Sequence, residues 1–249
     1  MKYLFSLPLL LAPLASCHIN FDTGSSWTVD GVRLEEHHLD KLEILSWDPA
    51  GLTIEHCASD VTILSDGGPT RIEATLHEFT LGDASLEYLD GKLTTVTVSG
   101  EPAAIGTLTM WTNMPLNILK ITAGAGDITL RGISVTERLT LESGSGDILI
   151  EEIDDLVNLA VSSGMGDVDV VSLTCPSLIA ATGMGDITLR FVNSDHASLA
   201  TGMGDINAIE SKFVKIKAAT GMGDIDASKS SYDSSDFDTG MGDTDRAGD

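Results

Sequence analysis

The stretch Gly202-Met203-Gly204-Asp205 carries the motif that decides the fold, Gly-x-Gly-Asp. Seven copies of this motif occur in the second half of the chain, and their aspartates follow one another at intervals of 20, 20, 19, 19, 19 and 19 residues. These aspartates are Asp127, Asp147, Asp167, Asp186, Asp205, Asp224 and Asp243. So steady a period indicates a repeat architecture, in which each unit packs mainly against its two neighbours.

Apolar residues alternate with polar ones on both sides of each motif. In the first six copies the residue after the aspartate is Ile or Val, and a further apolar residue follows two positions later. A period of two is typical of half-buried strands, whereas a glycine pair every 19 residues would interrupt a helix. We therefore predict an all-β fold, a right-handed parallel β-solenoid or β-helix of short 19–20-residue coils, with its glycines at sharp turns.

The chain before the repeats is less regular. We expect residues 31–117 to form an irregular β N-terminal part that caps the repeat solenoid of residues 118–249. His37 and His38 lie among acidic residues there, which could form a metal or acid–base site; because adjacent strand residues point to opposite faces, we expect a solvated acidic segment instead. At the other end, residues 228–238 replace core aliphatics by Ser and Asp, which favours a polar cap that blocks edge-to-edge pairing.

The N-terminus predicts export. Residues 1–16 combine Lys2 with a short apolar run that cannot span a bilayer, as in a signal peptide. The sequence Leu14-Ala15-Ser16-Cys17 resembles the lipobox of bacterial lipoproteins, which implies cleavage before Cys17 and its lipidation. Residues 17–30 would then be a tether, and the protein a membrane-anchored lipoprotein of the outer membrane or cell surface. The alternative is an ordinary secretory signal.

The net charge of the chain limits the classes of molecule that it is expected to bind. The chain has 38 acidic against 14 basic residues, a net charge of −24, which argues against nucleic acid. Attachment to a membrane would therefore rest on the N-terminal lipid. Two other cysteines, Cys57 and Cys175, could form a disulfide after export or remain as two buried thiols.

The repeats resemble a known bacterial family. Gly144-Ser145-Gly146-Asp147-Ile148, and residues 111–116 leading into the first copy of the motif, are similar to the putative-adhesin family, a domain of unknown function in envelope proteins. The resemblance covers roughly residues 40–249 and implies the solenoid fold, but carries little about function. The chain departs from that pattern by placing Met between the two glycines five times.

The seven motif aspartates form a predicted column of carboxylates. Stacked oxygen ligands could coordinate Ca²⁺, and like charges about 5 Å apart repel unless something offsets them. Alternatively, each aspartate accepts backbone N–H bonds within its own glycine turn.

A second predicted column holds the five methionines of the motif. They are Met165, Met184, Met203, Met222 and Met241. Facing outward, they would form an adaptable apolar ridge for a protein contact; facing inward, they would fill the corner of the solenoid. Thioethers also bind Cu(I), although only His196 lies close in sequence as a further ligand.

No catalytic triad, phosphate-binding loop or zinc signature is present in the sequence, so we expect no catalytic residue and no cofactor apart from the Ca²⁺ considered above. We predict a non-catalytic, lipid-anchored interaction or scaffold module whose partner is an unidentified envelope protein or glycan. Two alternatives remain: a polysaccharide-cleaving β-helix enzyme, and a regulatory accessory protein of the envelope-stress response.

Overall fold

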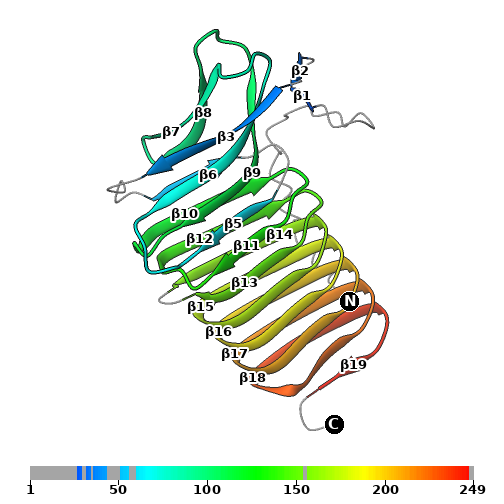
Figure 1. Ribbon diagram of the computed structural model, residues 1–249. Coiled ribbons are helices and arrows are strands. Elements are labelled where there is room, and N and C mark those ends of the chain that lie inside the picture. The colour runs from blue at the N-terminus through cyan, green and yellow to red at the C-terminus, as the bar shows by residue number, and fades with distance from the viewer. Residues whose placement is uncertain are drawn as a thin grey trace.

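A computed structural model describes residues 27–29, 32–34, 36–43, 51–55, 60–153 and 156–246. The fold is all-β, with 76% of the described residues in strands, and stacked parallel strands form a β-solenoid of about 7 turns (Figure 1). Within the described ranges there is no helix long and apolar enough to cross a membrane.

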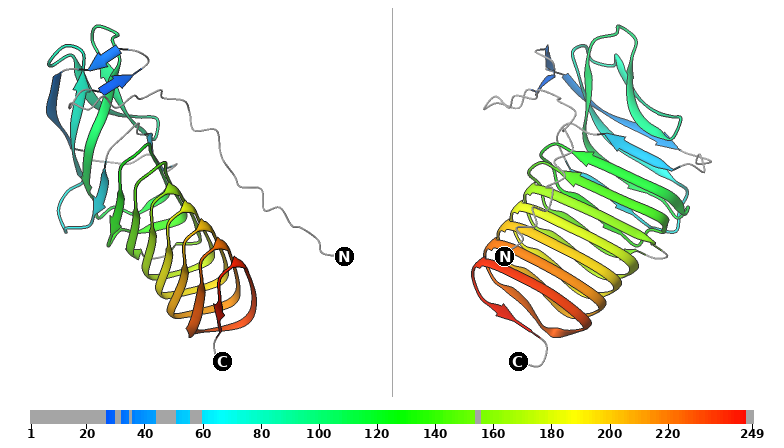
Figure 2. Two further views of the ribbon diagram at one scale, coloured as in Figure 1. Left: turned by 90° about the vertical axis from the view of Figure 1, so that its right-hand side faces the viewer. Right: turned by 180° about the vertical axis from the view of Figure 1, so that it is seen from behind.

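Ten strands build the stack of coils. They are β10 (Leu116–Ala123), β11 (Ile128–Arg131), β12 (Val135–Ser143), β13 (Ile148–Ile153), β14 (Asn158–Met165), β15 (Val168–Met184), β16 (Ile187–Met203), β17 (Ile206–Met222), β18 (Ile225–Met241) and β19 (Thr244–Asp245). Each pairs in parallel with the equivalent strand of the next coil, so that motif residues stack in register, as the pairing of Ile187 with Ile206 shows. Figure 2 shows the coils as a regular, elongated stack.

The core is a set of apolar columns inside this stack. Ile187, Ile206 and Ile225 occupy one column, and each is at most 1% exposed. Buried residues from residue 52 to residue 227 form one continuous cluster. The period-two pattern therefore specifies the interior directly, because every second residue of a strand points to the same face.

The N-terminal strands start the stack and then close its end. β4 (Leu52–Glu55) and β5 (Val61–Leu64) pair in parallel with β10 and β11. Beyond them, β6 (Arg71–Glu78) lies antiparallel between β3 (Glu36–Glu43) and β9 (Ala103–Trp111).

A β-hairpin of β7 (Ala84–Leu89) and β8 (Lys92–Thr97) projects from this cap, beside a small antiparallel pair of β1 (Trp27–Val29) and β2 (Val32–Leu34) (Figure 1).

A second corner of the coil carries no sequence motif. In four successive coils one non-glycine residue adopts a left-handed conformation there, with φ values of 55° at Glu152, 55° at Ser172, 56° at Phe191 and 48° at Glu210. Non-glycine residues take this conformation at some cost, so the strands on either side must enforce it.

The structure adds detail to two local expectations. His37 and His38 belong to strand β3, where His37 is exposed, as expected for a solvated segment; His38 is half-buried, and its Nδ1 lies 2.6 Å from the carboxylate of buried Glu78. In the last coil, Tyr232 and Phe237 pack edge to face with ring centroids 5.7 Å apart. The core therefore ends in a pair of aromatic rings as well as in polar residues.

Candidate functional site: the Met–Asp edge

One corner of the solenoid repeats the motif in every coil, and we call its outer surface the Met–Asp edge. It consists of Met165, Met184, Met203, Met222 and Met241 together with Asp167, Asp186, Asp205, Asp224 and Asp243. The methionines pair with one another in register from coil to coil. The edge therefore presents two parallel rows, one of thioethers and one of carboxylates.

Both glycines of the motif are required by how closely the coils stack. A Cβ at residue 204 would lie 2.1 Å from the carbonyl oxygen of Gly185, and a Cβ at residue 202 would lie 2.6 Å from that of Gly183. Gly204 also has a φ of +147°, which disfavours any side chain. The expected positive φ thus occurs at the second glycine of the last four motifs, while the first glycine is needed for space.

In five of the seven motifs a buried hydroxyl precedes the glycine pair and ties neighbouring coils together. The hydroxyl of Thr201 donates to the carbonyl of Gly185, and that of Thr220 donates to the carbonyl of Gly204, both at 2.9 Å. Ser143, Ser163 and Thr182 make the equivalent bond. We did not single out this column from the sequence, although the constant Ser or Thr before the first glycine is its signal in these coils.

The aspartates form a ladder of side-chain to backbone hydrogen bonds. The backbone N–H of Asp205 donates to Oδ1 of Asp186 at 2.7 Å, and the same bond joins every successive pair of motif aspartates at 2.7–2.8 Å. The ladder begins one step earlier than the motifs, because Asp127 N–H donates to Asp60 at 3.1 Å. The sequence pattern does not reveal Asp60, because no glycine pair precedes it.

This ladder replaces the turn-capping role that the sequence suggested. From Asp127 to Asp224, each carboxylate serves the N–H of the next coil and not that of its own turn, because the coils stack closely enough for the side chain to cross between them. Ca²⁺ normally takes six to eight oxygen ligands. In the part of the chain that the structure describes, no three His, Cys, Asp or Glu side chains gather where a metal ion could sit. Calcium binding by this column stays a prediction, and the geometry favours a role within the fold.

The methionines point outward. Their exposed fractions are 49% at Met165, 44% at Met184, 42% at Met203, 43% at Met222 and 66% at Met241. They do not fill the solenoid corner, because the glycines on either side bring the backbones of adjacent coils too close to enclose a side chain. The backbone beneath them is fixed, since Gly185 N–H donates to the Met203 carbonyl at 3.0 Å and this bond recurs from coil to coil.

Asp169 lies two residues beyond the motif aspartate Asp167, and its environment perturbs its carboxyl group. Burial raises the pKa of Asp169, and the carboxylates of Asp167 and Asp147 add to the rise. Arg190, whose Nη1 lies 3.7 Å from Oδ1 of Asp169, opposes it. A raised pKa is common at functional sites but also occurs in structural ion pairs, and neither of the two hollows described next includes this residue.

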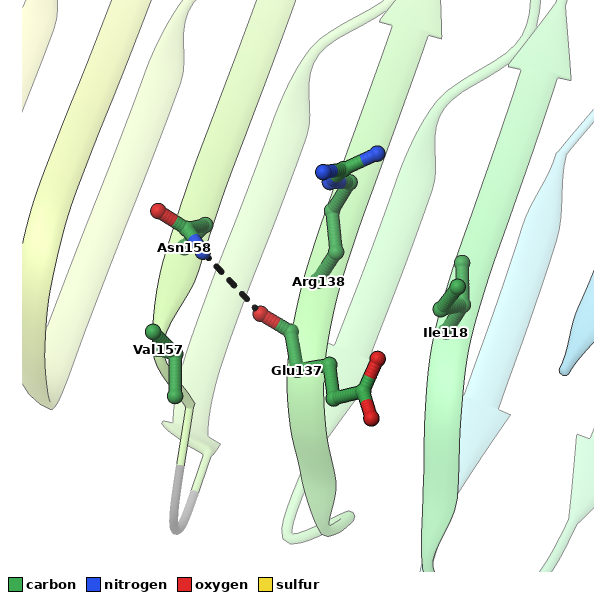
Figure 3. Close-up of a pocket in the computed structure, with 5 residues that line it drawn as sticks. All are labelled: Ile118, Glu137, Arg138, Val157 and Asn158. Atoms are coloured by element: carbon green, nitrogen blue, oxygen red, sulfur yellow. Dashed lines mark hydrogen bonds between the residues drawn. The ribbon is translucent and has the colours of Figure 1, made fainter. Parts of the chain in front are cut away.

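Two shallow hollows lie on the outer face of the coils. The first, of about 270 Å³, is lined by Ile118, Glu137, Arg138, Val157 and Asn158, with Asn158 donating to the Glu137 carbonyl at 3.5 Å (Figure 3).

The second hollow, of about 290 Å³, includes Ser177, Ser198 and His196. Within the described residues no hydrogen bond joins that imidazole to either of these hydroxyls.

Two predicted cysteine sites lie outside the described residues, namely the lipidation site Cys17 and Cys57. Cys175 is buried, and burial raises the pKa of its thiol to about 11, which makes it unreactive at neutral pH.

Comparison with known proteins supports the fold. The chain is similar to a putative adhesin from Parabacteroides distasonis (11% identity, TM-score 0.54), covering 84% of this chain and 97% of that one. A putative lipid binding protein from the same species has 13% identity and a TM-score of 0.51, with the same coverage of 84% and 97%. A putative adhesin from Parabacteroides merdae has 12% identity, a TM-score of 0.50, and coverage of 84% and 96%.

No curated protein matches the chain significantly. Residues 154–247, which hold the five Gly-Met-Gly-Asp motifs, match the family described as Toastrack DUF4097.

Proposed function

We propose that this chain is an exported, lipid-anchored, non-catalytic module that binds another envelope protein through its Met–Asp edge. The observation that carries the proposal is the row of five in-register methionines, 42–66% exposed, on a backbone fixed by bonds between coils. Solved proteins of similar fold described as putative adhesins support a place at the cell surface.

The chemistry of the edge indicates what it would bind. Scattered single apolar residues are normal on protein surfaces, but an aligned apolar row is typical of an interaction site. Thioether side chains adapt to varied partners, and the neighbouring carboxylates favour a partner with basic groups. We therefore propose a partner segment that combines apolar with basic side chains.

The alternative of a polysaccharide-cleaving enzyme receives less support from the coils. Strands β15 to β18 have 17 residues each, and only two residues, Gly and Asp, separate one from the next. So little chain between the strands provides no long loop to build a substrate groove. A regulatory role in the envelope remains compatible with the same edge, since it too requires a protein partner.

Site-specific photocrosslinking in the native host tests this proposal. A photoreactive residue at position 203 should capture a discrete partner, whereas one at position 214 should not, although Met203 and Val214 are similarly exposed at 42% and 46%. Replacing Met184 and Met222 by Ser should reduce capture at position 203 several-fold, because the neighbouring thioethers share the contact.

Two outcomes would contradict the proposal. Equal capture at positions 203 and 214 would show that the Met–Asp edge is not the binding surface. Retention of a Cys17→Ser variant in the membrane fraction would refute lipid anchoring without affecting the edge.

A further inference from the structure

An exposed apolar surface occurs at the N-terminal end of the solenoid, far from most of the Met–Asp edge. Phe79 and Leu81, in the loop between β6 and β7, are 53% and 59% exposed, and Val98, just after β8, is 93% exposed. We call these three residues the apolar tip. Both loops lie at the end of the molecule opposite the C-terminal coil (Figure 1).

The two loops of the apolar tip are joined to each other. Val98 N–H donates to the carbonyl of Asp83 at 3.1 Å, and Ser99 N–H donates to the carboxylate of Asp83 at 3.0 Å. The three apolar side chains are therefore presented by one connected structure and not by two independent loops.

A buried carboxylate fixes the first of these loops. Glu78 is 1% exposed, and its two oxygens accept the N–H groups of Gly82 and Ala84, each at 2.7 Å. His38 contacts the same carboxylate. Burying a carboxylate is costly unless it is fully hydrogen-bonded, so these bonds hold the loop in one shape while Phe79 and Leu81 remain in solvent.

The chain enters the fold at the same end. Leu34 at the end of β2 packs against Ala104, near the start of the strand that follows the second tip loop, and both are buried. β1 begins at Trp27, ten residues after Cys17. Ten residues span at most about 35 Å, so a lipid on Cys17 would keep this end of the molecule close to the membrane surface.

We propose that the apolar tip inserts into the lipid surface that holds Cys17, an inference that rests on the lipid anchoring in the proposed function. Phe and Leu side chains bury favourably at the boundary between head groups and acyl chains. Tethering gives that lipid a high effective concentration at the tip, which favours lipid over a soluble protein as its occupant. Because the chain carries a net charge of −24, contact should be strongest on zwitterionic lipid.

Quenching by brominated lipid tests the proposal in the full-length, lipidated chain. The protein is reconstituted into phosphatidylcholine vesicles with brominated acyl chains, as Val98→Trp and, for comparison, Leu89→Trp. Leu89 is also exposed, at 60%, but lies at the opposite end of the same hairpin, roughly 20 Å along the strand from the position of Val98. The fluorescence added by each new Trp is obtained by difference from the unmodified chain.

We expect quenching of the added fluorescence to be several-fold stronger for Val98→Trp than for Leu89→Trp. Flotation of the same vesicles reports anchoring independently. Protein that floats with vesicles but shows equal or no quenching at both positions would overturn the tip proposal and leave anchoring intact. Protein that fails to float would overturn both.

Discussion

At the scale of single residues, the motif corner combines three separate requirements. The two glycines allow backbone contact between coils, the hydroxyl before them bonds to the preceding coil, and the aspartate after them accepts an N–H from the following one. Only the side chain between the two glycines takes part in none of these contacts between coils. Its side chain is exposed, and it is Ala125 or Ser145 in the first two motifs and Met in the other five.

The first prediction concerns Gly204. Replacing it by Ala should lower the free energy of unfolding by about 2–4 kcal/mol, because the added Cβ would meet the Gly185 carbonyl and φ is positive. Gly68→Ala is the control, since its Cβ would come no closer than 3.2 Å to a flexible carboxylate. Chemical denaturation measures both variants, and equal stability of the two would contradict the close stacking of coils.

The residue types of this corner could be predicted from the sequence, but the directions in which their side chains point could not. The period places Gly202 and Gly204 at a turn, yet it does not say that Met203 faces solvent, because a corner residue belongs to neither face of a strand. Whether Asp186 bonds within its turn or to the next coil depends on the stacking distance, which the sequence does not contain.

At the scale of the element, each coil is stabilised by the coils on either side of it. Ile187 in β16 is 0% exposed and stacks on Val168 and Ile206. In such stacks, stability is approximately a sum of nearest-neighbour terms. Loss of one core side chain should therefore weaken the adjacent coils before it affects distant ones.

The second prediction tests this locality. Ile187→Ala should cost about 2–5 kcal/mol, and hydrogen exchange should show reduced protection in β15, β16 and β17 while β6 and β9 remain protected. Ser198→Ala, on the outer face of β16, is the matched control. Uniform loss of protection over the whole chain would show that the solenoid opens as one unit instead.

The coil period could be predicted from the sequence, whereas two other elements could not. The second corner uses Glu152, Ser172, Phe191 and Glu210 in the same left-handed conformation, and residues so different share no pattern. The antiparallel pairing of β3 with β6 was also missed, because that region has no repeat to fix its register.

At the scale of the whole molecule, charge opposes the compact state. With 38 acidic and 14 basic residues, the chain repels itself, and salt screens that repulsion. Raising NaCl from low to moderate concentration should increase Tm by about 2–4 °C, equivalent to roughly 1 kcal/mol.

The third prediction separates screening from specific metal binding. Ca²⁺ at equal ionic strength should add no further rise in Tm, because the ladder carboxylates from Asp127 to Asp224 already accept an N–H from the next coil. A large additional rise that Asp186→Asn reduces would instead establish the aspartate column as a calcium site. Thermal melts with EDTA, NaCl and CaCl₂ make the comparison.

The regular spacing of the Met–Asp edge offers a binding partner a series of nearly identical positions. Because β15 to β18 repeat every 19 residues, a segment that spans one or two coils meets nearly the same surface after a shift of one coil, about 4.8 Å. Binding would then be degenerate in position: one chain could hold several short segments at once, or let a single segment slide along it without full release.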